Sequence, residues 1–246
     1  MDKQLMITGK TSLVGLIGWP VGHSLSPIMH NAAFAELGCD FAYVPLPVRP
    51  EHVEQALRGL LALNFVGTNV TVPHKQAVMR YLDELSQAAR LTGAVNTIHI
   101  RDGKLWGYNT DAIGFLNSLQ EVGCDPKGMR VAVLGAGGAA RAVVYALARA
   151  GAASIVVLNR TAERAAFLVD DLHEAFADSK MSFEALTSNA LAALASQVEL
   201  VINTTSVGMY PDLDSSPWPN DVPMPSQVIF CDLVYNPLET VFLAQA

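Results

Sequence analysis

A glycine-rich turn is the strongest chemical signal in this sequence of 246 residues. The turn spans residues 135–140, follows a short apolar run directly and opens a stretch with helical spacing. In this context the first glycine permits a tight turn, and the second lets the backbone approach a pyrophosphate at the helix N-terminus. An ordinary strand-to-helix turn is the alternative. The predicted nucleotide-binding residues of the turn are Gly135, Ala136, Gly137, Gly138 and Ala139.

Two arginines after the next predicted strand indicate which dinucleotide is bound. An acidic residue at this position holds the free ribose 2′-hydroxyl of NAD. This chain has Asn159, Arg160 and Thr161 instead, with Arg164 one helical turn later. Guanidinium groups make charge-assisted hydrogen bonds to a 2′-phosphate, so the pair predicts NADP(H) as the cofactor. For either arginine alone, a solvated charge at a helix end is the alternative.

Two serines in the first half are candidates for binding a carboxylate. Ser24 and Ser26 are two residues apart, so their hydroxyls face the same way if the stretch is extended. Ser26 precedes Pro27 and is expected to open a helix, where free N–H groups attract an anion. A plain N-cap serine is the alternative for Ser26, and it leaves Ser24 unexplained.

Short motifs follow one another along the chain. They are S-L-S-P (24–27), N-V-T-V-P-H-K (69–75), G-A-V-N-T (93–97), N-T-D (109–111), G-A-G-G-A-A-R (135–141), N-R-T (159–161) and D-L-V-Y-N-P (232–237). Together, and in this order over nearly the whole chain, they resemble shikimate dehydrogenase. The resemblance implies reversible, NADPH-dependent reduction of 3-dehydroshikimate to shikimate, a step in aromatic amino-acid biosynthesis.

The resemblance also implies a role for particular side chains. Lys75 and Asp111 would form the catalytic pair, with the lysine as the acid beside the oxygen that gains negative charge when a ketone accepts a hydride. The implied substrate ligands are Ser24, Ser26, Thr71, Lys75, Asn96, Asp111 and Tyr235. Thr204 and Met209 would lie near the nicotinamide, although a polar exit from a strand is the alternative for this segment.

The end of the sequence departs from the resemblance. The family continues past residues 235–237 with helices that bring a substrate-binding glutamine, and Gln245 lies too early to be assumed that residue. Two alternatives therefore stay open. One is a dehydrogenase that acts on quinate as well, and the other is a non-catalytic NADP(H)-binding module with an incomplete substrate site.

Alternating strands and helices must position these residues. The predicted strands are 13–17, 41–44, 65–72, 96–100, 105–107, 131–134, 154–158, 181–183, 200–203 and 228–232, most of them separated by helical stretches. This order predicts an α/β fold, with an N-terminal α/β substrate domain and a Rossmann-type, doubly wound NADP-binding domain. We expect residues 1–111 with 236–246 to form the substrate-binding catalytic domain and residues 112–235 to bind NADP.

Composition excludes several classes of protein. A net charge of −7 without a cluster of basic residues argues against nucleic acid as a partner, and 51% hydrophobic with 16% charged residues argues against disorder. Three cysteines far apart are typical of reduced cytosolic thiols, and no histidines have metal-ligand spacing. We therefore expect a cytoplasmic enzyme without a metal or membrane span, a small-molecule substrate as partner, and a monomer or homodimer.

Overall fold

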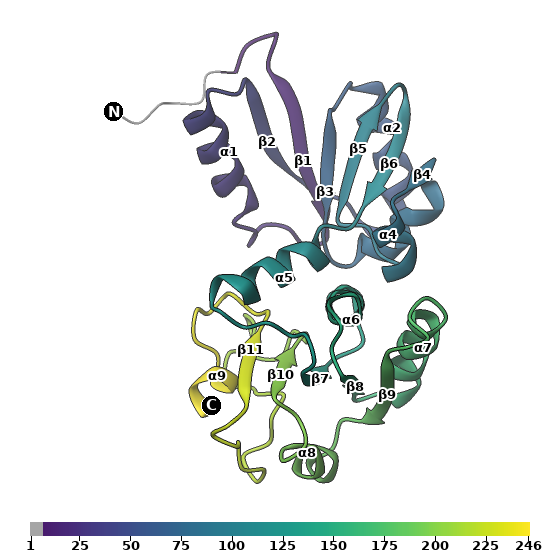
Figure 1. Ribbon diagram of the computed structural model, residues 1–246. Helices are drawn as coiled ribbons and strands as arrows, with labels where there is room; N and C mark the ends of the chain where they lie inside the picture. The colour runs from purple at the N-terminus through teal and green to yellow at the C-terminus, as the bar shows by residue number, and fades with distance from the viewer. Residues whose placement is uncertain (1–6) are drawn as a thin grey trace. The chain divides into compact units, whose positions relative to one another are not determined.

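The computed structural model describes residues 7–246, which fall into two compact units (Figure 1). Unit 1 ends at Thr110, and unit 2 runs from Asp111 to Ala246. Each unit has its own sheet with helices packed on it, which confirms the predicted α/β fold class. No helix within residues 7–246 combines the length and the apolar character needed to cross a lipid bilayer.

Unit 1 contains a six-stranded mixed sheet in the order β2-β1-β3-β5-β6-β4. The strands are β1 (Ser12–Gly18), β2 (Phe41–Pro47), β3 (Gly67–Val70), β4 (Glu84–Leu85), β5 (Thr97–Arg101) and β6 (Lys104–Tyr108). Strand β1 pairs in parallel with β2 and β3, whereas β5 is antiparallel to both β3 and β6. The loop after β3 and the start of β5 therefore meet at one edge of the sheet.

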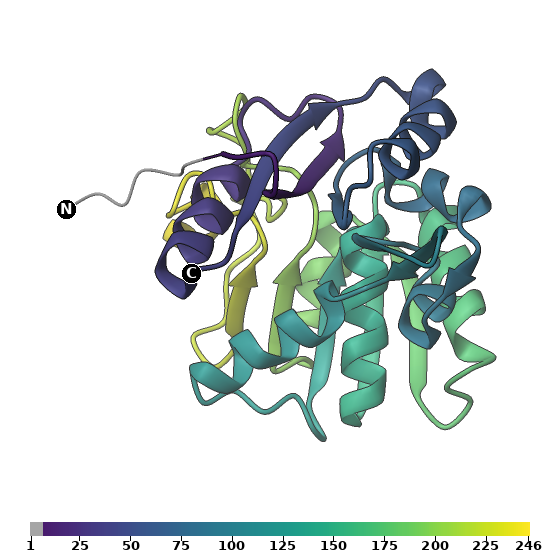
Figure 2. The same ribbon diagram turned by 90° about the horizontal axis from the view of Figure 1, so that it is seen from above.

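The helices of unit 1 flank this sheet (Figures 1 and 2). They are α1 (Ser26–Leu37), α2 (Val53–Ala62), α3 (His74–Ala77) and α4 (Gln87–Thr92), with short 3-10 turns η1 (Pro50–His52) and η2 (Val78–Tyr81). Helix α2 packs on the sheet because Val53, Leu57 and Leu60 recur at helical spacing and form one buried face.

Unit 2 contains a five-stranded parallel sheet in the order β11-β10-β7-β8-β9. The strands are β7 (Arg130–Leu134), β8 (Ser154–Asn159), β9 (Lys180–Ala185), β10 (Leu200–Asn203) and β11 (Ile229–Asp232). The chain runs outward from β7 to β9 and then returns to the other side of β7. The loops after β7 and β10 therefore flank the switch point where doubly wound sheets bind ligands, which confirms the predicted Rossmann-type sheet.

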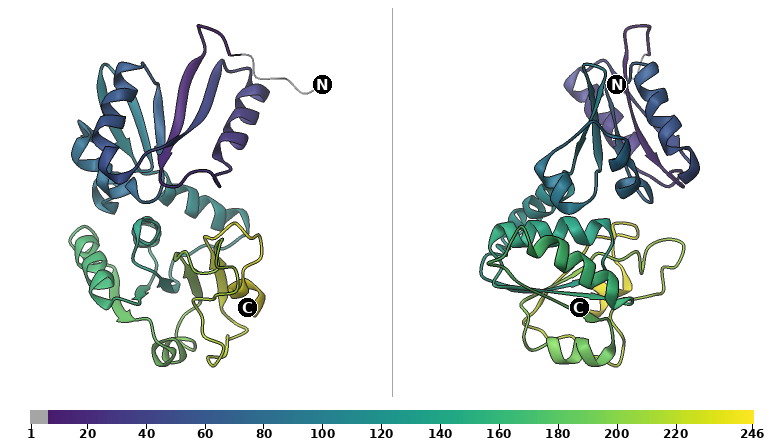
Figure 3. Two further views of the ribbon diagram at one scale, coloured as in Figure 1. Left: turned by 180° about the vertical axis from the view of Figure 1, so that it is seen from behind. Right: turned by 90° about the vertical axis from the view of Figure 1, so that its right-hand side faces the viewer.

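Helices cover both faces of the unit 2 sheet (Figure 3). They are α5 (Asp111–Glu121), α6 (Gly138–Ala150), α7 (Ala162–His173), α8 (Ser188–Leu194) and α9 (Val241–Gln245). Side chains alternate between the two faces of each strand, so Leu134, Leu158 and Val201 pack with Leu191 of α8 and Phe242 of α9 in one core cluster.

The last residues pack differently from the expected domain division. The sequence grouped residues 236–246 with residues 1–111, but the structure packs them on unit 2. Phe242 is fully buried there and contacts Phe230 edge to face, and the Thr240 hydroxyl donates a hydrogen bond to Asp232 (2.7 Å). The five-residue helix α9 is too short for its apolar face to be recognised by periodicity, and the assignment of function to each unit stays a prediction.

Candidate functional site

Gly135 requires glycine for two independent reasons. Its φ is +112°, a conformation that L side chains rarely adopt. A Cβ at this position would also lie 2.6 Å from Thr204 Oγ1. The Thr204 hydroxyl is held in turn by a hydrogen bond to the Leu134 carbonyl (2.7 Å). The structure thus brings the predicted residues Gly135 and Thr204 together where the loops after β7 and β10 meet.

Within residues 7–246, neither the backbone conformation nor a neighbouring atom requires glycine at position 137. Its φ of −90° is open to other residues, and a Cβ there would meet no protein atom of residues 7–246 within 4 Å. It is the N-cap of the 13-residue helix α6, whose first turn has neither a side-chain cap nor an acidic residue among the described residues. The N–H groups of that turn lack intrahelical partners. A helix N-terminus with this open approach fits a pyrophosphate.

The predicted 2′-phosphate clamp follows β8. Asn159 donates a hydrogen bond from Nδ2 to the Thr161 carbonyl (2.9 Å) and so shapes the turn that leads into α7. The side chains of Arg160 and Arg164 are exposed. Within residues 7–246 neither guanidinium is in an ion pair with a carboxylate at 4.0 Å or less. Both charges are therefore available to an anionic ligand.

A buried amide holds the loops that leave β10 and β11. Asn203 is fully buried, donates from Nδ2 to Asp232 Oδ1 (2.9 Å), and accepts at Oδ1 from the N–H (2.9 Å) and hydroxyl (2.7 Å) of Thr205. The same Asp232 oxygen accepts the N–H of Val234 (2.9 Å). These bonds fix the start of both loops, on which the predicted residues Met209 and Tyr235 are exposed.

The two predicted carboxylate-binding serines differ in their contacts. Helix α1 begins at Ser26, but Leu25 is the residue at the cap position and makes no side-chain cap. Ser24 Oγ accepts the N–H of Ser26 (3.2 Å). The alternative of a plain N-cap role for Ser26 is therefore wrong, because Ser26 is the first residue inside the helix and Ser24 accepts its N–H.

Tyr43 and Asn69 join this site although the sequence analysis did not predict them. The Tyr43 hydroxyl donates to Asn69 Oδ1 (2.8 Å), and Asn69 Nδ2 donates to Thr97 Oγ1 (3.2 Å). Thr97 Oγ1 donates to Asn96 Oδ1 (3.0 Å). The predicted residue Asn96 is thus connected to Tyr43 through two side chains, Asn69 and Thr97. A polar asparagine inside the short strand β3 is the one signal in the sequence that pointed to this arrangement.

Lys75 lies in a segment that hydrogen bonds hold in place. Its carbonyl accepts the N–H of Val95 (2.8 Å), just before β5, and the backbone N–H of Thr71 bonds the Ile17 carbonyl (2.9 Å). His74 is buried, and its Nε2 lies 2.6 Å from the Val48 carbonyl, so this nitrogen carries the proton. These contacts place the half-buried Lys75 side chain at the edge where β1 and β3 end and β5 begins.

The predicted catalytic pair is divided between the two units. Asn96, which lies in unit 1 with Lys75, exchanges hydrogen bonds with Thr110 (2.9 Å from Nδ2 to Oγ1, 3.0 Å from the Thr110 N–H to Oδ1). Asp111 is the first residue of α5 in unit 2, where the helix N-terminus favours a carboxylate. Pairing of Lys75 with Asp111 stays a prediction, as does the placing of Tyr235 near the substrate.

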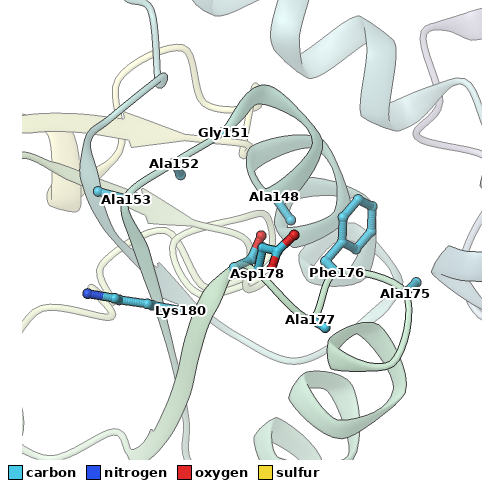
Figure 4. A pocket seen from close by; sticks show the side chains of 10 residues that line it. Ala148, Gly151, Ala152, Ala153, Ala175, Phe176, Ala177, Asp178 and Lys180 are labelled. Atoms are coloured by element: carbon cyan, nitrogen blue, oxygen red, sulfur yellow. The ribbon is translucent and has the colours of Figure 1, made fainter.

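A separate hollow of about 480 Å³ lies elsewhere in unit 2 (Figure 4). It is lined by Ala148 and residues 151–153 at and after the end of α6, and by residues 175–180 up to the first residue of β9, including Asp178 and Lys180. These residues lie where the strands begin, at the edge of the sheet opposite Gly135. The hollow therefore contains none of the predicted site residues. Within the described part of the chain, no three His, Cys, Asp or Glu side chains gather closely enough to hold a metal ion.

Comparison with known proteins matches both units. The family described as shikimate dehydrogenase substrate binding domain matches residues 16–98, and the family described as shikimate / quinate 5-dehydrogenase matches residues 118–210. The shikimate dehydrogenase (NADP(+)) of Moorella thermoacetica is 51% identical over 245 residues, which are 98% of this chain and 81% of that protein.

Solved structures are similar over nearly the same length. A shikimate dehydrogenase in complex with NADP+ has a TM-score of 0.89 and 43% identity, covering 98% of this chain and 83% of its own. The shikimate 5-dehydrogenase of Thermus thermophilus, in complex with NADP(H) and shikimate, has a TM-score of 0.84 and 37% identity, covering 96% of this chain and 84% of its own.

Proposed function

The chain belongs to the shikimate dehydrogenase family, and we propose from this premise how its residues divide the work of the family's reaction. It is an NADP-dependent oxidoreductase that reduces 3-dehydroshikimate to shikimate reversibly, a step in aromatic amino-acid biosynthesis. The observation that carries this function is that the two families match consecutive parts of the chain, one in each unit. The cofactor, when bound, supplies the hydride.

The loops at the carboxyl edge of the unit 2 sheet are the proposed cofactor site. The open approach to Gly137 and the uncapped first turn of α6 support pyrophosphate binding there. Arg160 and Arg164 bind the 2′-phosphate, which their exposure and lack of carboxylate partners within residues 7–246 support. The remaining proposed cofactor contacts are Gly135, Ala136, Gly138, Ala139, Asn159, Thr161, Thr204 and Met209.

The proposed substrate ligands are side chains that can bind a carboxylate or a hydroxyl group. Ser24 and Ser26 bind the carboxylate, and Thr71, Asn96 and Asp111 bind the hydroxyl groups, with Tyr235 as a further contact. The hydroxyl oxygen of Ser24 already accepts the N–H of Ser26, so its own proton is free to be donated to a carboxylate. This arrangement supports recognition of an acid by hydroxyl and helix N-terminal N–H groups together.

Lys75 is the proposed proton donor. Hydride transfer to the substrate ketone builds negative charge on its oxygen, and an ammonium group beside that oxygen both stabilises the charge and delivers the proton. In the oxidation of shikimate the neutral lysine takes the hydroxyl proton back. The anchoring of the segment through His74 and Val95 supports this role, because an acid must hold its position while charge develops. Asp111 orients the substrate and the lysine.

We further propose that the chain works in the cytoplasm as a monomer or a homodimer on its small-molecule substrate. The three cysteines, Cys39, Cys124 and Cys231, are free thiols, as reducing compartments maintain them. Cys124 is buried and Cys231 half-buried on β11, so packing rather than redox chemistry accounts for both.

A steady-state assay with shikimate and NADP+ tests this function. NADPH absorbance should rise with time, and kcat/KM should be higher with NADP+ than with NAD+. Tight NADPH binding without turnover of any cyclic hydroxy acid would instead identify a non-catalytic NADP(H)-binding module.

Quinate is a second candidate substrate because the family matched by residues 118–210 is described by both names. The two acids differ by small polar groups on the ring, so the comparison of their kcat/KM values decides between one substrate and two. A higher value for quinate than for shikimate would reverse the assignment of the physiological substrate.

A further inference from the structure

Tyr43 is held in one orientation by contacts on three sides. The Asn31 side chain bonds both backbone groups of Tyr43, accepting from its N–H (2.8 Å) and donating to its carbonyl (2.9 Å). The His30 ring stacks on the tyrosine ring at a centroid distance of 4.4 Å and an interplanar angle of 7°. Only 4% of Tyr43 is exposed. Its hydroxyl therefore occupies a fixed point beside Ser26.

From this point a series of hydrogen bonds crosses unit 1. It runs from Tyr43 on β2 to Asn69 on β3 and on to Thr97 on β5, and it ends at the side chain of Asn96. Asn69 also donates from Nδ2 to the Asn96 carbonyl (3.3 Å). We call this series the unit 1 relay. At its far end is Asn96, which is proposed to bind the substrate.

The relay determines which way each amide group faces. The Asn96 carbonyl can only accept a hydrogen bond, so the nitrogen of the Asn69 amide faces this carbonyl and Thr97, and the amide oxygen accepts the phenol of Tyr43. Thr97 then has an acceptor oxygen occupied and directs its own proton to Asn96 Oδ1, which leaves Asn96 Nδ2 as the donor group. Burial raises the pKa of Tyr43 to about 12, an increase that the bond with Ser26 partly offsets, so the phenol keeps its proton at neutral pH.

We propose that Tyr43 is a positioning residue for substrate binding, which holds Asn69 and, through Asn69 and Thr97, the side chain of Asn96. The proposal rests on the proposed function, because Asn96 acts as a substrate ligand only in that reaction. Without the phenol, Asn69 Oδ1 loses its partner in the relay, so the Asn69 side chain is held by fewer bonds and positions Thr97 and Asn96 less firmly. The variant therefore binds the substrate more weakly, while the rate of hydride transfer and the affinity for the cofactor are unchanged.

The variant Tyr43→Phe removes one oxygen from the relay and leaves the stacked ring in place. We expect KM for shikimate to rise about tenfold, equivalent to about 1.4 kcal/mol, while kcat and KM for NADP+ stay within about twofold of wild type. Tyr145→Phe is the matched control, because Tyr145 is also 4% exposed and its hydroxyl accepts a hydrogen bond from Arg149 in unit 2 (3.1 Å). The control should change no kinetic constant.

A double-mutant cycle separates positioning from plain structural damage. If Tyr43 acts through Asn96, adding Tyr43→Phe to Asn96→Ala should raise KM by clearly less than the product of the two single effects. Thr97→Val removes the hydroxyl at the far end of the relay and should also raise KM for shikimate selectively. It serves as the test if Tyr43→Phe folds poorly.

Several results would overturn the proposal. The first is an unchanged KM for shikimate in folded Tyr43→Phe. The second is a double variant whose KM rises by the full product of the two single effects. The third is an equal rise in KM for shikimate and for NADP+. A lower melting temperature with normal KM would show a structural role only. Failure of the proposed function itself is distinguishable, because then the wild-type protein would not oxidise shikimate at all.

Discussion

The two proposed binding regions are built from different parts of the chain. In unit 2, the turn at Gly135 and Gly137 offers backbone N–H groups, and the absence of side chains is what admits a ligand. In unit 1, the relay through Tyr43 and Asn69 offers side-chain atoms whose orientation depends on one another. Adding a single methyl group should therefore damage the first region, whereas removing a single oxygen should damage the second.

Lys75→Ala should produce the largest loss, since it removes the proposed acid from the side-chain region. We expect kcat to fall by roughly 10²–10⁴ with a modest change in KM, the kinetic signature of lost proton donation. Lys104→Ala, at an exposed position on β6, is the control for loss of a lysine charge. A near-wild-type kcat for Lys75→Ala would remove this residue from the catalytic pair.

Substituting Gly135 and Gly137 separately by alanine should distinguish an effect on cofactor binding from an effect on the stability of the fold. Gly137→Ala places a methyl group where no described protein atom lies, so the melting temperature should not change, while KM for NADP+ rises roughly 5- to 150-fold from overpacking of about 1–3 kcal/mol.

Gly135→Ala should instead destabilise the fold itself. A side chain at a φ of +112° and the close contact with Thr204 together should lower the free energy of unfolding by about 1–3 kcal/mol. Thermal unfolding of the two variants without ligand measures the contrast. Equal melting temperatures would show that the two glycines serve the same purpose.

Arg160→Ala should affect one cofactor only. Loss of a charge-assisted hydrogen bond of about 1.5–3 kcal/mol should raise KM for NADP+ about 10- to 100-fold and leave KM for NAD+ unchanged. Arg58→Ala, at an exposed position on α2 in unit 1, controls for loss of a surface guanidinium. Similar losses with both cofactors would contradict a 2′-phosphate clamp.

Alkylation of cysteines should have the smallest effect on activity. Burial, with the neighbouring Asp232 carboxylate, raises the pKa of Cys231 to about 11, so little thiolate is present at roughly pH 8. Exposed Cys39, which lies outside the proposed sites, should react first with iodoacetamide. Intact mass should show one added group with activity retained, and the rate at Cys231 should increase as the pH approaches 11. Early loss of activity at one added group would place Cys39 near a functional surface.

The sequence predicted the backbone region better than the side-chain region. A dinucleotide turn is encoded locally, in a strand, a few small residues and a helix, so residues 135–140 were sufficient to predict the strand-to-helix turn that the structure contains. Tyr43 and Asn69 are 26 positions apart, and only the pairing of β1 with both β2 and β3 brings them together. The periodic pattern of apolar residues in the sequence does not indicate such a contact. For the same reason, the Tyr43 contact of Ser26 was not foreseen.

Short elements were the other source of error. Helix α8 begins where the Thr187 side chain accepts the N–H of Ala190 (3.2 Å), and helix α9 begins at a similar cap on Thr240, but both span two turns or fewer. Tertiary packing decides such boundaries, because short helices gain little from propensity alone.

Two-substrate steady-state kinetics test the central claim most directly. Initial rates should be measured against both shikimate and NADP+ for wild type, Gly137→Ala and Tyr43→Phe. The account predicts that the wild type oxidises shikimate, that Gly137→Ala raises KM only for NADP+, and that Tyr43→Phe raises KM only for shikimate. If either variant raised both constants equally, the assignment of a backbone-made cofactor region and a side-chain-made substrate region would be contradicted.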